Sequence, residues 1–487
     1  MVDLSYLHGV TLNESADTPS LLRVKKHGIT FINGTAPNAD PAAFPLNYPT
    51  LVTSLSAAAA LGSAGTLLED VTTVLNEGGT WVIVNRVEHS DTAATLEANL
   101  IGDPVARTGL YAALRAKAIT GYQPRVIITA GNTGTWIEGG VVSVSLSAEG
   151  AELTEAPVVT ATGGGNDPGK VLPTLAAVMG EGANAGKVTG VTVVSAGKKL
   201  SEPPLLTFTG GGTAAGKVLP AATANVGDVA NAFISALNVV TAKIRARAYV
   251  SGPNTTNAEA VRWRGTLNGG RILPIDPKTI KNVAGVPVVK PVVAVFAGIR
   301  SRVVASAEGV SGSVSNKIIR TIDGVARTIT YPDDSNYLND NQVATIINER
   351  GGFRTWGSRL ATDDQLWQFD SVRATADMVN EALEDLYFDY VDCKFTKANL
   401  KMMIEDGNAA LRVFAKNEDI LGGRVWLSAV NEPTLMANGK VFLDVEFEPV
   451  GLMEQIGITT HRNILYYRLL LDEVQGAIET GPLSIAA

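Results

Sequence analysis

Residues 347–385 read INERGGFRTWGSRLATDDQLWQFDSVRATADMVNEALED. A segment rich in glycine and aromatic residues comes first, and Phe353 and Trp356 within it are predicted core residues. From Asp370 onward, apolar residues recur every three or four positions. They are Val372, Ala376, Val379, Leu383 and, one turn later, Leu386. This spacing predicts an amphipathic helix with one apolar face.

Two further elements follow this helix towards the C-terminus. Residues 397–417 repeat the helical spacing, with Leu400, Ile404, Leu411 and Phe414 on one face. Residues 439–449 instead alternate apolar with acidic positions, which is typical of a half-buried strand. The three acidic residues of that strand, Asp444, Glu446 and Glu448, are the solvated side of the alternation rather than an acid–base pair.

The N-terminal half alternates helical and strand patterns. Residues 66–79 and 110–121 suit helices, 80–88 and 124–131 suit strands, and 228–249 suit a further helix. Such alternation predicts a mixed α/β, multi-domain chain. The most apolar run, VPVVKPVVAVFAGI at 286–299, is rich in β-branched residues and is predicted to be a buried strand. It is too short and too interrupted by Lys and Pro to span a bilayer.

Residues 132–226 differ from the rest, being poor in aromatics and rich in Gly, Ala, Thr and Val. PVVTATGGGNDPGKVLP begins at Pro157 and PLLTFTGGGTAAGKVLP begins at Pro204, so the repeat period is 204 − 157 = 47 residues. Two copies of strand, GGG turn and GKVLP predict an inserted small β domain.

Within the first copy, GGNDPGKV (164–171) resembles a phosphate-binding G-x-x-x-x-G-K loop. Such a loop needs a Ser or Thr next and must open a helix. Val171 stands there instead, and Pro173 would break a helix in its first turn. The stretch is predicted to be a turn.

Composition and motifs provide no catalytic constellation. The net charge of −8 and pI of about 5.3 argue against a nucleic-acid binder, and the single Cys393 excludes an intrachain disulfide. The four histidines lack metal-ligand spacing, and GVSGS around Ser311 lacks the last Gly of a nucleophile elbow. Asp333, Asp334 and Asp340 lack the pattern of an EF-hand. No cofactor, metal or catalytic residue is predicted, which favours a structural role over an enzyme.

Several stretches resemble one family, the major tail sheath proteins of contractile-tailed (myovirus-type) bacteriophages. Gly352, Phe353, Trp356, Gly357 and Arg359 match the family pattern G-F-R-x-W-G-x-R. AAFPLNYPTLVTS (42–54), TWVIVNRVE, ITGYQPRVIITAG, SNKIIRTIDGV, GGRVWLSAVNEP and GKVFLDVEFEPVGLMEQI are also similar to family segments. The resemblance is strong from about 345 to 470 and does not cover 132–226.

The resemblance implies a domain plan and a function. The plan has an N-terminal arm (1–30), an α/β middle domain (31–131 and 227–350), an outward-facing insert (132–226), a tube-facing C-terminal domain (351–462) and a C-terminal arm (463–487). Subunits would stack as hexameric rings around a tail tube and contract to drive it through the bacterial envelope. Partners would be other copies, the tail tube protein, and baseplate and tail terminator proteins. Nucleic acid and membrane insertion are not expected. The location would be the virion, after assembly in the host cytoplasm.

The resemblance also implies candidate contact residues. Extended arms would add strands to neighbouring subunits, because backbone hydrogen bonds persist while subunit bodies rotate. The arm candidates are Val10, Thr11, Leu12, Leu21, Leu22, Val24, Ile464, Tyr466, Leu469 and Leu471. Lys401, Arg412 and Lys416 are candidates for meeting an acidic tube.

Three alternatives remain open. One is the sheath of a phage-derived contractile bacteriocin or injection system. Another is a hydrolase, because the family's middle domain is described as subtilisin-like. The last is a surface-binding module carried by the repeats.

Overall fold

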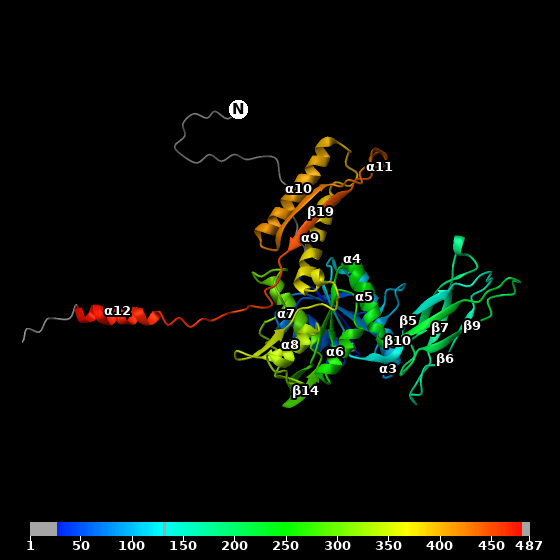
Figure 1. The fold of residues 1–487 in the computed structure, drawn as a ribbon, viewed down its shortest axis with the longest axis horizontal. Helices are drawn as coiled ribbons and strands as arrows, with labels where there is room; N and C mark the ends of the chain where they lie inside the picture. Colours follow the sequence, from blue (N-terminus) through cyan, green and yellow to red (C-terminus); the bar gives the residue numbers. More distant parts are fainter. Residues whose placement is uncertain (1–26, 130–132, 480–487) are drawn as a thin grey trace, which may run out of the picture. The chain divides into compact units, whose positions relative to one another are not determined.

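A six-stranded sheet forms the centre of the fold (Figure 1). The computed structural model describes residues 27–129 and 133–479, and the chain divides into two compact units, one reaching Val450 and the other beginning at Gly451. The strand order is β12-β11-β4-β1-β3-β2, and all neighbours are parallel except β2 and β3. The strands are β1 (Thr30–Thr35), β2 (Thr50–Val52), β3 (Val82–Val87), β4 (Val126–Thr129), β11 (Arg247–Ser251) and β12 (Ile272–Ile275).

Helices cover both faces of this sheet, as a largely parallel sheet requires. Side chains alternate along β1, so Ile32 joins the core formed with α2 (Leu67–Asn76) and α7 (Val293–Ala305). Phe31 joins the opposite core, which includes α5 (Ala232–Ile244). The predicted α/β class is confirmed.

The remaining helices of this unit connect and flank these layers. They are α1 (Leu55–Ala58), α3 (Ala93–Ile101), α4 (Ala116–Thr120), α6 (Asn257–Thr266), α8 (Asp333–Asp340), α9 (Asp370–Phe388), α10 (Lys397–Lys416) and α11 (Pro433–Ala437). The segment predicted as one helix at 110–121 is a 3₁₀ helix, Gly109–Arg115, followed by α4.

The apolar run at 286–299 corrects one prediction. It was predicted to be a buried strand, but only its start is a strand, β14 (Val286–Lys290), paired with β13 (Thr279–Val283) and partly exposed. After Pro291 the chain forms α7, in which Val293–Ser301 are all buried. A helix buried on every side lacks a polar face, so its sequence cannot be told from a buried strand by periodicity.

The insert carries the sequence repeat as an internal two-fold arrangement. Its strands are β5 (Trp136–Ala148), β6 (Val158–Gly163), β7 (Thr174–Met179), β8 (Val188–Ser195), β9 (Pro204–Thr209) and β10 (Ala221–Ala230). In the antiparallel pair β6–β9, Thr160 lies opposite Thr207, its own equivalent 207 − 160 = 47 residues on. The register of β7 on β8 is reproduced by β10 on β5 after the same shift. The two repeats therefore pack about a local two-fold axis.

The last part of the first unit is a smaller α/β layer. Helices α9 and α10 share a core with the two-stranded antiparallel sheet of β18 (Ile420–Leu427) and β19 (Leu443–Pro449). Both helices and β19 lie where the periodicity predicts them. Just before α9, β16 (Thr345–Asn348) pairs with β17 (Phe353–Trp356), whose Phe353 packs against the central core. β15 (Gly324–Val325) lies beside β13.

The second unit contains a helix where the family resemblance implies an extended C-terminal arm. Residues 451–463 have no regular secondary structure, and a helix, α12 (Tyr466–Glu479), follows. Apolar residues in α12 recur with helical spacing, which explains why the isolated segment is helical. The domain boundaries given above, and the outward orientation of the insert, remain predictions.

Candidate functional site

The GKV loops are closed by their own lysines. The Nζ of Lys170 donates to the carbonyls of Gly163 (2.8 Å) and Gly165 (2.6 Å), and Lys217 does the same with Gly210 (3.1 Å) and Gly212 (2.8 Å). The loop leads through a bridge at Val171 to β7 rather than into a helix. The lysine ammonium thus bonds carbonyl oxygens where a phosphate loop would present N–H groups, and the predicted turn is confirmed.

The candidate catalytic and metal residues have structural contacts. The Ser311 hydroxyl donates to Asp419 (2.8 Å), and burial raises the pKa of that carboxyl, while the bond from Ser311 lowers it. Asp334 accepts from the Thr330 hydroxyl and backbone at the start of α8, and these bonds lower its pKa. Among the described residues no cluster of three or more His, Cys, Asp or Glu could hold a metal ion. No described helix is both long and apolar enough to cross a membrane.

A row of buried ion pairs joins α9 to the central sheet. Arg247, the first residue of β11, forms an ion pair with Asp370 at 2.7 Å, and Arg271, just before β12, forms one with Asp377. Arg125, just before β4, bonds Glu381. These arginines stand at the amino ends of three adjacent parallel strands, while the carboxylates lie along one helix. The periodicity of residues 370–388 predicts the apolar face of α9 but not this polar one.

A fully buried tyrosine, Tyr249, also belongs to this network of ion pairs. The Tyr249 hydroxyl donates to Asp370 at 3.1 Å. Burial, followed by the charge of Asp370, raises the pKa of Tyr249, so the hydroxyl remains a donor. Arg300 also faces Asp370, at 3.7 Å, and burial lowers its pKa. Asp370 is thus surrounded by two arginines and a hydroxyl, a fixed point between α9 and the sheet.

The tube-facing candidates share one face of α10. Lys401, Arg412 and Lys416 are all exposed, and at about 100° per residue they lie within roughly 60° of one another around the helix axis. Glu405 lies on the same stripe. The face is therefore predominantly but not purely basic. Whether it meets a tube stays a prediction.

The arm candidates are not brought together in the described residues. Val10, Thr11, Leu12, Leu21, Leu22 and Val24 lie outside those residues. Ile464 precedes α12, and Tyr466, Leu469 and Leu471 lie on it, all with more than half of their surface exposed. If Tyr466, Leu469 and Leu471 were to add a strand to another subunit, α12 would have to unwind. Residues 451–463 have no helix to lose and are therefore the better candidates for strand addition.

The sheet of β18 and β19 provides a surface that sequence reasoning did not identify. Among the described strands each pairs only with the other, so each has an outer edge without a ladder partner. Leu421 on β18 is 73% exposed. A two-stranded sheet with open edges is a natural acceptor for added strands. The alternating pattern at 439–449 predicted a strand, but it could not show how many other strands pair with it.

Comparisons with known proteins agree with this architecture. No protein-family profile matches the chain. It is 23% identical over 97% of its length to the major tail sheath protein of Serratia phage KSP20, covering 99% of that protein. It is 22% identical over 93% of its length to the tail sheath protein of Escherichia phage P2, covering 94% of it.

Solved structures also share the fold across the same span. The sheath complex of an extracellular contractile injection system in the contracted state covers 95% of this chain and 99% of its own, with a TM-score of 0.57 at 11% identity. Similarity to phage tail sheath proteins from end to end, on a fold that contractile sheaths share, identifies the chain as a relative of the major tail sheath proteins of contractile-tailed bacteriophages.

Proposed function

We propose that this chain is the structural subunit of a contractile phage tail sheath. The observation that carries the proposal is whole-length similarity: the matches to curated tail sheath proteins span both the central sheet and the C-terminal layer. Because the relatives compared come from phages, we place the protein in the virion of a phage rather than in an injection system.

In the proposed assembly, subunits form hexameric rings stacked around a tail tube and joined at the ends to baseplate and terminator proteins. Contraction drives the tube through the bacterial envelope. The fold suits the mechanical demand, since buried ion pairs hold α9 on the central sheet. The body and the C-terminal layer would then rotate together as rigid elements.

Connections between subunits would run through the chain ends. Segments before residue 27 and after residue 450 would add strands to the outer edges of β18 and β19 in neighbouring copies. Backbone hydrogen bonds give such contacts strength without demanding a fixed orientation of the bodies. The 13 residues at 451–463 could reach across about 45 Å when extended, enough to let adjacent subunits turn.

We infer no enzymatic activity. The Ser311 hydroxyl donates to Asp419, and the buried His27 lies 3.9 Å from Glu381. Among the described residues, the hydroxyl of Ser311, the nucleophile candidate, therefore donates to an aspartate and a backbone carbonyl rather than to a histidine base.

Negative-stain electron microscopy of the purified protein, with and without residues 1–22, tests the proposal. Hollow cylinders from the full chain that are lost on truncation are expected. If neither the full chain alone nor the full chain mixed with its tail tube protein forms cylinders, the sheath proposal is overturned.

A further inference from the structure

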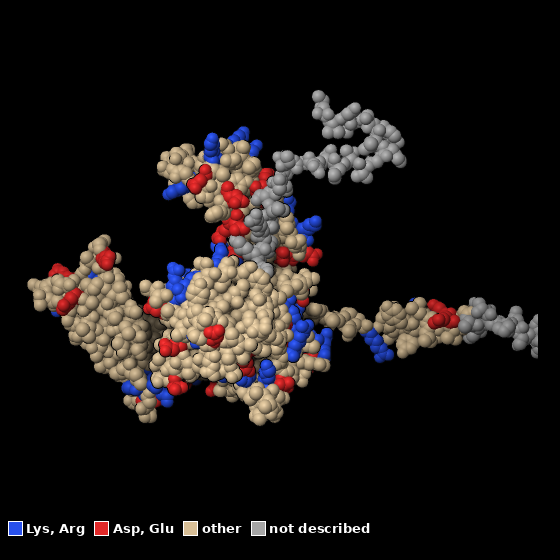
Figure 2. All heavy atoms as spheres, turned by 180° about the vertical axis from the view of Figure 1, so that it is seen from behind, with Lys and Arg blue, Asp and Glu red and all other residues tan. Residues whose placement is uncertain are grey.

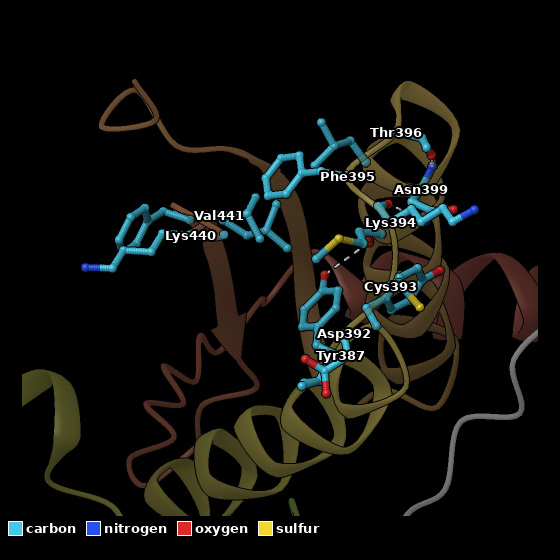
Figure 3. Close-up of a pocket in the computed structure, with 16 residues that line it drawn as sticks. Tyr387, Asp392, Cys393, Lys394, Phe395, Thr396, Asn399, Lys440 and Val441 are labelled. Carbon is cyan, nitrogen blue, oxygen red and sulfur yellow. Dashed lines mark hydrogen bonds between the residues drawn. The ribbon is translucent and has the colours of Figure 1, made fainter. Parts of the chain in front are cut away.

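A large apolar groove lies at the outer end of α9 and α10 (Figure 3). Its volume is about 960 Å³, and it is lined by the loop joining the two helices on one side and by the start of β19 on the other. Phe395 and Phe442 from these two sides are each more than 40% exposed. Apolar side chains of this size usually find a partner, so the groove is a candidate binding surface.

The rim of the groove is basic. Lys394 and Lys440 lie on opposite sides of it in Figure 3, and Asp392 is its acidic lining residue. Figure 2 shows Lys and Arg gathered at this end of the C-terminal helices. An occupant with an apolar stripe and acidic flanks fits both the floor and the rim.

Helix α12 has that character. Tyr467, Leu470, Leu471 and Val474 follow the i, i+3, i+4, i+7 spacing of helices that bind in grooves, and each is at least half exposed. With one basic residue, Arg468, and three acidic ones, the helix has a formal charge of 1 − 3 = −2. Among the described residues nothing covers its apolar stripe.

We propose that α12 of one copy docks its apolar stripe in the groove between Phe395 and Phe442 of a second copy. The proposal rests on the proposed function in one respect: docking requires that copies of the chain lie next to one another. It adds a helix-in-groove contact to the strand contacts at β18 and β19. The segment before α12 supplies the reach to another subunit.

A native cysteine in the groove allows the docking to be tested by disulfide cross-linking. Cys393 is the sole cysteine in the sequence, is exposed, and lines the groove. Single cysteines placed on the stripe (Leu470→Cys, Leu471→Cys or Val474→Cys) are expected to form disulfides with Cys393 of another copy under mild oxidation. A ladder of covalent multimers on non-reducing gels is the expected readout, and it should vanish in a Cys393→Ser background.

Leu469→Cys is the matched control, because Leu469 is equally exposed but points away from the stripe. Ladders of equal yield from Leu469→Cys overturn the proposal, as does thiol loss without multimers, which would mean docking within one copy. Cylinders without ladders overturn the docking while leaving the sheath function intact. Ladders without cylinders support the docking but not the sheath function. If neither ladders nor cylinders form, the docking and the sheath function are both contradicted.

The charges provide an independent check. Lys394→Glu with Lys440→Glu should abolish the Val474→Cys ladder, and Asp472→Lys with Glu473→Lys should restore it. Failure of restoration, with circular dichroism unchanged, would show that the basic rim does not select α12.

Discussion

Arg271 donates hydrogen bonds of 2.6 and 2.7 Å to the two carboxylate oxygens of Asp377, and both side chains are almost fully buried. The pair joins the amino end of β12 to the middle of α9, 106 residues apart in the sequence. A bidentate pair of this kind fixes orientation as well as distance.

Removing one partner of this pair should destabilise the fold strongly. Arg271→Met leaves Asp377 buried with only the more distant Arg373, 3.9 Å away, facing it, at a cost of about 3–5 kcal/mol. Arg271→Met combined with Asp377→Leu should recover most of that loss, because no buried charge remains. Urea unfolding of each variant measures the free energies.

The exposed pair Arg424–Glu446 is the matched control for this experiment. Arg424→Met should cost less than about 1 kcal/mol, since solvent screens the pair. Equal losses of unfolding free energy in Arg271→Met and Arg424→Met would contradict the conclusion that the buried Arg271–Asp377 pair stabilises the fold.

Asp70 should make stability depend on pH. Burial, and then the neighbouring Glu69, raise the pKa of Asp70 to about 7, while Lys290 opposes the shift. Because the pKa is raised on folding, the folded state is favoured when Asp70 is protonated. That stability is present below about pH 4 and is lost as the pH rises through about 7.

Asp70→Asn tests this sign directly. The variant should come close to the parent at about pH 4 and be more stable at pH 8, by up to about 4 kcal/mol. Thermal unfolding at the two pH values gives the comparison, and Asp91→Asn, at an exposed position, should show no such divergence. A constant difference across this range would rule out titration of Asp70.

The two lysines of the repeat should be equivalent. Lys170→Met and Lys217→Met each leave two glycine carbonyls without the ammonium that binds them, at a cost of about 1–3 kcal/mol. Hydrogen exchange should rise in the insert and stay unchanged in the central sheet. Lys187→Met, which removes an exposed ion pair with Glu149, is the control. Unequal effects of the two lysine variants would show that the two repeats, although alike in structure, do not contribute equally to stability.

The basic face of α10 should govern binding to the tube. Replacing Lys401, Arg412 and Lys416 by Glu should abolish co-sedimentation with purified tubes without changing thermal stability, because all three are exposed. Lys198→Glu with Lys199→Glu in the insert, also exposed, is the control for acidic charge added elsewhere on the surface. Normal sheaths on tubes from the triple variant would discard the proposed contact.

The sequence by itself determined the elements whose pattern is local. Helices α9 and α10, strand β19 and the 47-residue repeat could be predicted because amphipathic periodicity and repetition are written in consecutive residues. The family followed from the short G-F-R-x-W-G-x-R pattern and its neighbours. Val171 and Pro173 were enough to reject a nucleotide site.

The tertiary structure alone decided which distant residues meet. Arginines at the amino ends of β4, β11 and β12 reach α9 only because parallel strands bring these ends to one side of the sheet. The helix α7 was misread as a strand because burial on all sides erases periodicity. The groove beside Cys393 forms from segments almost 50 residues apart, and such a surface has no signature along the chain.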